Sequence, residues 1–185
     1  MEDEKILELY WQREERAIAE TKEKYGHYCQ TISYNILNNY EDAKECENDT
    51  YNALWNLIPP NRPHYFKAYL GRVVRNISLS KYDYNSAKKR NSTMDLIISE
   101  LEECLVGKED VAVSYEEGQI AKHISEFLRT EEKLKRQVFV RRYYYSDSIA
   151  TISRQFGISE SKVKSMLFRL RNKLKCYLEK EGVRI

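Results

Sequence analysis

The side chains best suited to chemistry in this 185-residue chain are cations gathered near its carboxyl end. Lysine and arginine recur from residue 162 to residue 175, and no acidic residue lies between Ser161 and Tyr177. Guanidinium and ammonium groups neutralise phosphates, and a row of charges of one sign is typical of a surface that binds nucleic acid. The row consists of Lys162, Lys164, Arg169, Arg171, Lys173 and Lys175.

A second group of cations alternates with aromatic residues between residues 64 and 91. Cations bind the backbone of a separated strand, and aromatic rings offer faces on which unpaired bases stack, for about 1–3 kcal/mol per base. The composition predicts a second nucleic-acid surface, although tyrosine is frequent throughout the chain and such rings also complete cores. The group includes Tyr65, Lys67, Tyr69, Arg72, Arg75, Asn76, Lys81, Tyr82, Tyr84, Lys88, Lys89 and Arg90.

The other reactive side chains form no catalytic or metal-binding pattern. The four cysteines and three histidines are scattered without a CxxC pair, so we expect no metal site and no cofactor. The cysteines are expected to pack as small apolar residues. Adjacent carboxylates occur at Glu102-Glu103 and Glu116-Glu117, but neighbours in sequence do not face each other on a helix. We therefore do not expect an enzyme, for instance one that modifies RNA.

The carboxy-terminal cations need a helix to present them, and residues 147–175 predict a helix-turn-helix. A first helix is expected over 148–156, with Gly157 at the turn and Ser159 capping the second helix. Ser153 is small and would let the helices cross closely. The second helix carries an apolar stripe at spacings of three and four residues, with the cations on its outer face, which is the form that lies in a major groove. The stripe consists of Val163, Leu167, Leu170, Leu174 and Leu178.

The rest of the chain also indicates helices. Only six Gly and three Pro interrupt long runs of helix-forming residues, which predicts an all-α protein with two small helical domains. We expect a helical domain over 1–91 and a helix-turn-helix domain over 120–185. Between them, 92–119 is rich in acidic residues and is interpreted as an acidic linker, with a short helical piece near 96–105.

Several local features of these domains can be predicted. Gly26 is expected to interrupt or bend the helix around it. The helix over about 43–57 is expected to begin at a capping box formed by Asp42 and Glu45. One face of this helix should be buried and the other exposed, the exposed face consisting of Lys44, Glu47, Asn48, Asp49 and Asn52. The buried face should hold Ala43, Cys46, Thr50, Ala53, Leu54 and Leu57.

Composition narrows the class of protein further. Apolar residues make up 42% of the chain, enough for packed cores, and the net charge of +2 favours no particular class of partner. The amino-terminal stretch is charged and lacks the apolar segment of a signal peptide. No stretch approaches the roughly 20 apolar residues of a membrane span, so we expect a cytoplasmic protein without membrane insertion.

Three stretches together resemble the extracytoplasmic-function branch of bacterial RNA polymerase sigma factors, which have a sigma-two and a sigma-four domain. EDAKECENDTYNALW (41–55) resembles the sigma-two helix that docks on the polymerase clamp helices, with Asn48-Asp49 in place of Gln-Glu. YFKAYLGRVVRNISLSKY (65–82) resembles the promoter-melting and minus-ten-reading segment. The stretch 136–175 resembles the sigma-four domain, and within it GISESKVKSMLFRLR (157–171) is similar to the family's recognition helix.

The resemblance implies a role for each group of residues. Core RNA polymerase, through its clamp helices and flap, and promoter DNA would be the partners, and the family also allows for an anti-sigma factor. The minus-35 element would be bound by Lys162, Lys164, Ser165, Arg169 and Arg171. The opened minus-ten strand would be held at a flipped base by Asn76 and at phosphates by Arg72, Arg75, Lys81, Lys88, Lys89 and Arg90. The polymerase would be bound by Asp42, Glu45, Asn48 and Asp49.

Two alternatives remain open on the residues alone. The chain could be a stand-alone helix-turn-helix regulator that binds duplex DNA as a dimer, with 1–119 as a sensing or dimerisation module. Basic amphipathic helices also bind membranes or partner proteins. Co-purification with core polymerase and run-off transcription would distinguish a sigma factor from either alternative.

Overall fold

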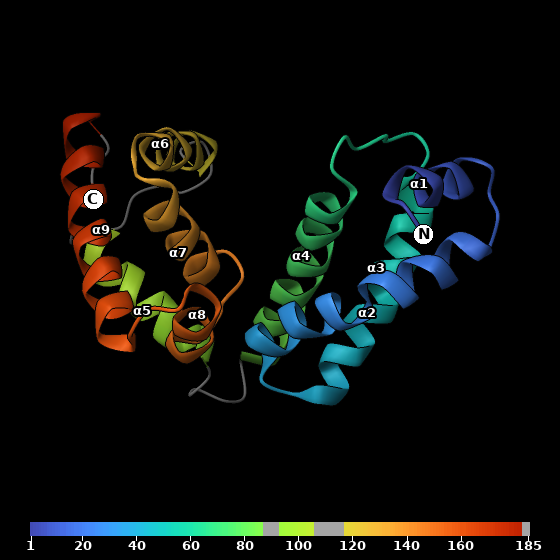
Figure 1. Ribbon diagram of the computed structural model, residues 1–185, viewed down its shortest axis with the longest axis horizontal. Helices are drawn as coiled ribbons and strands as arrows, with labels where there is room; N and C mark the ends of the chain where they lie inside the picture. The colour runs from blue at the N-terminus through green and yellow to red at the C-terminus, as the bar shows by residue number, and fades with distance from the viewer. Residues whose placement is uncertain (87–92, 106–116, 183–185) are drawn as a thin grey trace. The chain divides into compact units, whose positions relative to one another are not determined.

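A computed structural model describes residues 1–86, 93–105 and 117–182, and Figure 1 shows its helices. Every regular element in these residues is an α-helix, which confirms the all-α class. The chain divides into two compact units, Met1–Met94 and Asp95–Ile185. Within the described residues, no helix combines the length and apolar character that crossing a membrane would require.

The first unit is built from helices that pack around one apolar core. Helices α2 (Arg16–Leu37), α3 (Tyr40–Leu57) and α4 (Phe66–Ser86) contact one another, and α1 (Asp3–Trp11) packs on α2 and α4. Helix α1 buries Ile6 and Tyr10 completely, and the Tyr10 hydroxyl lies 3.1 Å from the Thr21 hydroxyl on α2. The apolar faces of these helices therefore pack together in a shared core, as amphipathic helices require.

Gly26 does not break α2, contrary to the sequence expectation, because the helix continues through it to Leu37. A Cβ at this position would lie 3.1 Å from Oε1 of Glu47, which is buried on α3. Glycine is unfavourable inside a helix, but here it gives room for the Glu47 carboxylate between α2 and α3. Its role is therefore close packing rather than interruption.

Helix α3 differs from the expectation at its start and on its faces. It begins at Tyr40, and the side chain of Asn39 caps it by accepting hydrogen bonds from the backbone N–H groups of Glu41 and Asp42. The predicted capping box at Asp42 and Glu45 is therefore wrong, since Asn39 already satisfies the first free N–H groups. On the predicted exposed face Glu47 is buried instead, and on the predicted buried face Leu57 is 37% exposed.

Helix α4 follows a proline-rich break and packs closely on α2. Phe66, Leu70 and Val74 recur every four residues along α4 and are buried, and the buried stripe continues to Ser78, whereas Ile77 is half-buried. The Ser78 hydroxyl donates to the Ser33 hydroxyl at 2.9 Å, which joins α4 to α2 through a buried polar pair. Buried polar groups of this kind are stable only when hydrogen-bonded.

The second unit contains all but the first two residues of α5 (Thr93–Leu105). It also contains α6 (Glu117–Thr130), α7 (Lys133–Tyr143), α8 (Ile149–Phe156) and α9 (Glu160–Lys180). Helix α6 ends at Thr130 and α7 begins at Lys133, so the chain turns between them. The helical piece expected within 92–119 is α5, and its Ile97 is 1% exposed in the core of this unit. The acidic segment is thus partly a packed helix; residues 106–116 lie outside the described residues.

The cysteines divide between core and surface. Cys29 and Cys46 are buried in the first unit, as small apolar residues are expected to be. Cys176 is exposed on α9, so the expectation that it packs in the core is wrong: position 176 lies away from the Leu174–Leu178 stripe. The side chain of Cys104 lies outside the described residues.

Candidate nucleic-acid interface

The turn between α8 and α9 has the geometry that the sequence predicts. The Ser148 hydroxyl caps α8 by accepting from Thr151 N–H at 3.1 Å, and α8 ends at Gly157, whose φ of 63° is left-handed. The Ser159 hydroxyl then caps α9 by accepting from Lys162 N–H at 3.2 Å. Left-handed glycine and serine caps each satisfy helix ends locally, so the two helices join through a short turn.

Ser153 contributes more than the small size for which the sequence singled it out. Its hydroxyl donates a hydrogen bond of 2.6 Å to the carbonyl of Ile158, across the turn from its own helix. The carbonyl of Ile158 immediately precedes the α9 cap, so this bond fixes the direction in which α9 leaves the turn.

Helix α9 separates an apolar face from a cationic one. Val163, Leu167, Leu170, Leu174 and Leu178 are each at most 1% exposed, and they form the core of the unit together with residues of α5, α6, α7 and α8. Four of the predicted DNA-binding residues lie exposed on the same helix: Lys162, Lys164, Ser165 and Arg169. Lys162, Ser165 and Arg169 line one cavity beside this helix, whereas Lys164 is exposed outside it.

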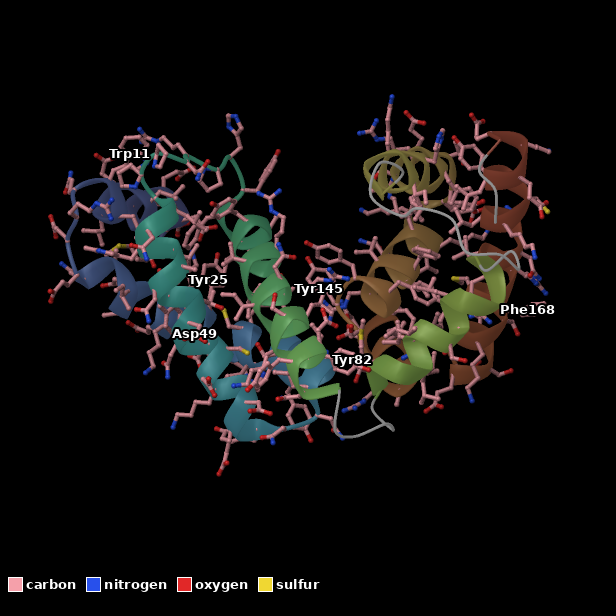
Figure 2. The ribbon with its side chains drawn as sticks, turned by 180° about the vertical axis from the view of Figure 1, so that it is seen from behind. Trp11, Tyr25, Asp49, Tyr82, Tyr145 and Phe168 are labelled. Atoms are coloured by element: carbon pink, nitrogen blue, oxygen red, sulfur yellow. The ribbon has the colours of Figure 1, made fainter. Side chains whose placement is uncertain are left out.

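Phe168 is a residue of this surface that the sequence analysis missed. It is 58% exposed on α9, and the guanidinium of Arg171 lies 6.0 Å from its ring centroid; Figure 2 labels it. An exposed aromatic ring among cations can contact the methyl group of a thymine. The signal was present in the sequence, because position 168 is apolar yet falls outside the spacing of the buried stripe.

Arg171 differs from the other predicted DNA-binding residues of α9. Its side chain is only 13% exposed, and Nη1 donates to the Tyr143 hydroxyl at 2.9 Å and lies 3.6 Å from Oε2 of Glu100. Burial raises the pKa of Tyr143 to about 12, so its hydroxyl remains protonated and donates in turn to Glu100 at 3.1 Å. Arg171 is thus engaged by its own protein.

A cavity of about 730 Å³ lies beside the cationic face, between the start of α7 and α9. It combines cations with hydroxyl groups, and the Lys173 ammonium on its wall pairs with Glu131 at 2.8 Å. Apolar side chains, among them Leu134, Met166 and Leu170, line the same cavity, so its wall is mixed in character. Its lining includes Glu132, Lys135, Ser159, Lys162, Ser165 and Arg169.

The predicted surface on α4 is present in part. Arg72 and Asn76 are exposed, Arg75 is half-buried, and the Arg72 guanidinium lies 5.3 Å from the ring centroid of Tyr69. Tyr65 and Tyr84, at 81% and 83% exposure, are the most open of the exposed large hydrophobic residues that the structure describes. Such rings are free to stack on bases. The predicted residues Lys88, Lys89 and Arg90 lie outside the described residues.

Lys81 is drawn toward the predicted polymerase-binding residues instead of solvent. Its ammonium donates to Glu45 at 2.8 Å and lies 3.7 Å from Asp42. The hydrogen bond to Glu45 raises the pKa of Lys81 above its usual range, against the opposing effect of desolvation. Asn85 also donates to Asp42, at 3.2 Å. Asp42 and Glu45, predicted to bind polymerase, and Lys81, predicted to bind DNA, therefore interact with one another within the chain.

The remaining predicted polymerase-binding residues, Asn48 and Asp49, are exposed on α3. Figure 2 shows Asp49 on that helix. Asp49 also lines a shallow cavity of about 470 Å³ together with Asn76 and Lys81, so the two predicted surfaces of the first unit meet at this place.

Glu47, which the sequence placed on the same exposed face, is instead held inside the unit. Its carboxylate accepts hydrogen bonds of 2.6 Å from both the Gln30 amide and the Tyr51 hydroxyl. Burial, followed by the hydrogen bond to Glu47, raises the pKa of Tyr51. Glu47 is therefore unavailable to a partner, since its oxygens already have donors.

In the described ranges, no set of three or more histidine, cysteine, aspartate or glutamate side chains is arranged to hold a metal ion. Comparison with known proteins finds a family match within the second unit. Residues 132–174 match the family model described as Sigma-70, region 4. The matched stretch begins one residue before α7 and ends within α9, so it contains α7, α8, the turn and the larger part of α9 with most of its cations. No curated protein matches the chain.

Proposed function

We propose that this chain, whose residues 132–174 match sigma-70 region 4, is a sigma factor of the extracytoplasmic-function type. Region 4 is a DNA-binding part of sigma factors, which supports a role in promoter recognition. The observation that carries the proposal is the match itself, which falls on the one helix-turn-helix of the described residues. As a sigma factor the chain would act with RNA polymerase in the cytoplasm.

In this proposal α9 enters the major groove of the minus-35 element. The exposed side chains of Lys164, Ser165 and Arg169 lie nearest to bases and phosphates, and Lys162 contributes a backbone contact. Arginine reads guanine through two hydrogen bonds, which makes Arg169 the strongest candidate for a base contact. Support comes from the buried stripe, which fixes the cations outward.

The first unit would bind core polymerase and the opened minus-ten strand. Exposed Asn48 and Asp49 on α3 suit polymerase docking, and exposed Arg72, Asn76 and Tyr65 on or beside α4 suit a single strand with a flipped base. Lys81 would not bind DNA in this proposal. It pairs with Glu45 and Asp42 and so holds these two polymerase-binding carboxylates in place. The chain catalyses no reaction of its own, and bond formation belongs to the polymerase.

The decisive experiment combines the purified chain with bacterial core polymerase and a genomic promoter library at low salt. We expect polymerase-dependent transcripts that start downstream of a shared pair of elements. Binding to core enzyme without transcription would contradict promoter recognition. Tight binding of a palindromic duplex without polymerase, together with no affinity for core enzyme, would instead establish the stand-alone regulator.

A further inference from the structure

Helix α5, from the acidic segment between the predicted domains, is anchored in the DNA-binding unit. Ile97 is 1% exposed in the core that also contains Leu167 and Leu170 of α9, and Leu101 packs against the same core. Leu96, on the other side of α5, is 65% exposed. One face of α5 is therefore part of the structure that supports the recognition helix α9.

The carboxylate of Glu100 lies on this inner side and joins α5 to α7. It accepts hydrogen bonds from Arg142 Nη2 at 2.6 Å and Nε at 3.2 Å, and Arg142 is 4% exposed. Arg142 also donates to the carbonyl of Asp147, in the segment between α7 and α8. A two-point contact of a buried guanidinium with a carboxylate is strong and directional.

The same carboxylate reaches α9 through Tyr143. The Tyr143 hydroxyl donates to Glu100 at 3.1 Å and accepts from Arg171 at 2.9 Å, and Arg171 itself lies 3.6 Å from Glu100. On another side of α9, Lys173 pairs with Glu131 at 2.8 Å. The recognition helix is thus held by ion pairs at two places, one of which depends on α5.

We propose that Glu100 and Arg171 are positioning residues for DNA reading. Glu100 fixes the rotation of α9 against α7 through Arg142, Tyr143 and Arg171, and Arg171 serves this arrangement instead of binding a phosphate. The inference rests on the proposed function, because it concerns how the DNA-binding helix is oriented. The proposal also gives α5 a role in orienting the DNA-binding helix. The acidic composition of that stretch alone did not indicate such a role.

Physical reasons favour positioning over phosphate binding for Arg171. A guanidinium that is 13% exposed and already bonded to a tyrosine and near a carboxylate has few free N–H groups for DNA. Base readout, by contrast, tolerates little error, since a binding site must be held within about 0.5 Å of its productive geometry. A small rotation of α9 would therefore move Arg169 away from its base while the exposed cations still attract phosphates.

The experiment measures binding of the full-length chain to two probes across a range of salt concentrations. The first is a duplex that the wild-type chain selects from a random library, and the second has the same composition in scrambled order. The variants are Glu100→Gln, Arg171→Lys, their double variant and Arg171→Ala. Lys162→Ala is the matched control for a phosphate contact, because Lys162 is exposed on the same helix. All are compared at a temperature at which circular dichroism shows equal helix content.

We expect Glu100→Gln and Arg171→Lys each to lower the ratio of selected to scrambled affinity by about tenfold, without changing the slope of log K against log salt. The double variant should lose no more than either single variant, because both break one arrangement. Lys162→Ala should instead reduce the slope by about 0.9. If Glu100→Gln fails to fold, Arg171→Lys, which keeps the charge, carries the test.

Three results would overturn the inference. A phosphate role for Arg171 predicts that Arg171→Ala lowers the salt slope as Lys162→Ala does. A purely structural role predicts an unchanged affinity ratio in the folded variants. Higher affinity for both probes after Glu100→Gln would mean that the Glu100 carboxylate competes with DNA for the cations of the protein. If the wild-type chain selects no duplex but directs transcription with core polymerase, the inference fails and the proposed function stands. If it also directs no transcription, the proposed function fails.

Discussion

Gly71 shows how a single position controls the packing of the first unit. A Cβ at residue 71 of α4 would lie 2.5 Å from the hydroxyl oxygen of Tyr28 on α2, closer than any unstrained contact. The ring of Tyr28 also receives the ammonium of Lys67, 5.1 Å from its centroid. Glycine at position 71 therefore lets an aromatic residue of α2 lie directly on the backbone of α4.

Gly71→Ala should destabilise the chain by about 1–3 kcal/mol, the usual cost of overpacking a filled site. Urea unfolding followed by circular dichroism would measure the loss. Combining it with Tyr28→Phe, which removes the hydroxyl, should recover most of the stability. A Gly71→Ala variant as stable as wild type would show that α2 and α4 shift apart freely.

Arg169→Ala should weaken binding of the selected duplex by about 1–3 kcal/mol and relax the preference at one base position, as expected for a residue that reads a base. Selection from a randomised duplex library measures the preference directly. Lys180→Ala is a matched control, because it removes an equal charge from another exposed position of α9. Unchanged selection by the Arg169→Ala variant would show that Arg169 contacts only the backbone.

At the scale of elements, α1 is held to α2 by a charged contact as well as by its core residues. Asp3 accepts hydrogen bonds from Lys24 Nζ at 2.7 Å and from the Tyr25 hydroxyl at 2.6 Å. Desolvation opposes ionisation of Asp3, but these hydrogen bonds outweigh it, so its pKa lies below the usual value of 3.8. The folded chain therefore favours the ionised form of Asp3.

This lowered pKa predicts the direction of a pH dependence. Because the folded pKa is depressed, the contribution of Asp3 to stability is present above pH 3.8 and is lost as the pH falls through the folded value. Unfolding curves of wild type and Asp3→Asn should therefore differ near neutral pH and converge in acid. Curves that stay equally far apart down to about pH 2, below the usual range of carboxyl pKa values, would contradict a stabilising ion pair between α1 and α2.

At the scale of the whole molecule, the proposal gives different steps of initiation to the two units. The exposed pair on α3 would bind polymerase, whereas α9 would choose the upstream element. Substitutions on α3 should then leave recognition of the upstream element unchanged, and substitutions on α9 should leave polymerase binding unchanged. Independent roles are consistent with a chain that divides into two compact units.

Asn48→Ala combined with Asp49→Ala should reduce capture of core polymerase at least tenfold, a loss of about 1.4 kcal/mol. Folding should be intact, because both side chains are exposed. Polymerase pull-down and helix content by circular dichroism give the two readings, and Glu23→Ala on the exposed side of α2 is the control. Normal capture by the double variant would remove α3 from the docking surface.

Much of the second unit could be predicted from the sequence, because its signals are local. A serine cap, a left-handed glycine and an apolar stripe act within a few residues of one another, and α8, Gly157, Ser159 and α9 lie where expected. Predictions from local sequence were wrong at the start of α3, where two residues could cap the helix, and at Gly26. Asn39 caps α3 in place of the predicted box, and α2 runs through Gly26.

The sequence by itself determined the all-α class, the turn between α8 and α9, and the row of outward cations on α9, since backbone caps and helical periodicity fix these features. Only the tertiary structure decided which charged residues face each other. Lys81 meets Glu45 from 36 residues away, and Arg142 meets Glu100 from 42 residues away. No periodicity encodes such pairs, because they depend on how separate helices rotate and pack. The same packing turned Glu47 inward and drew Arg171 away from the cationic face.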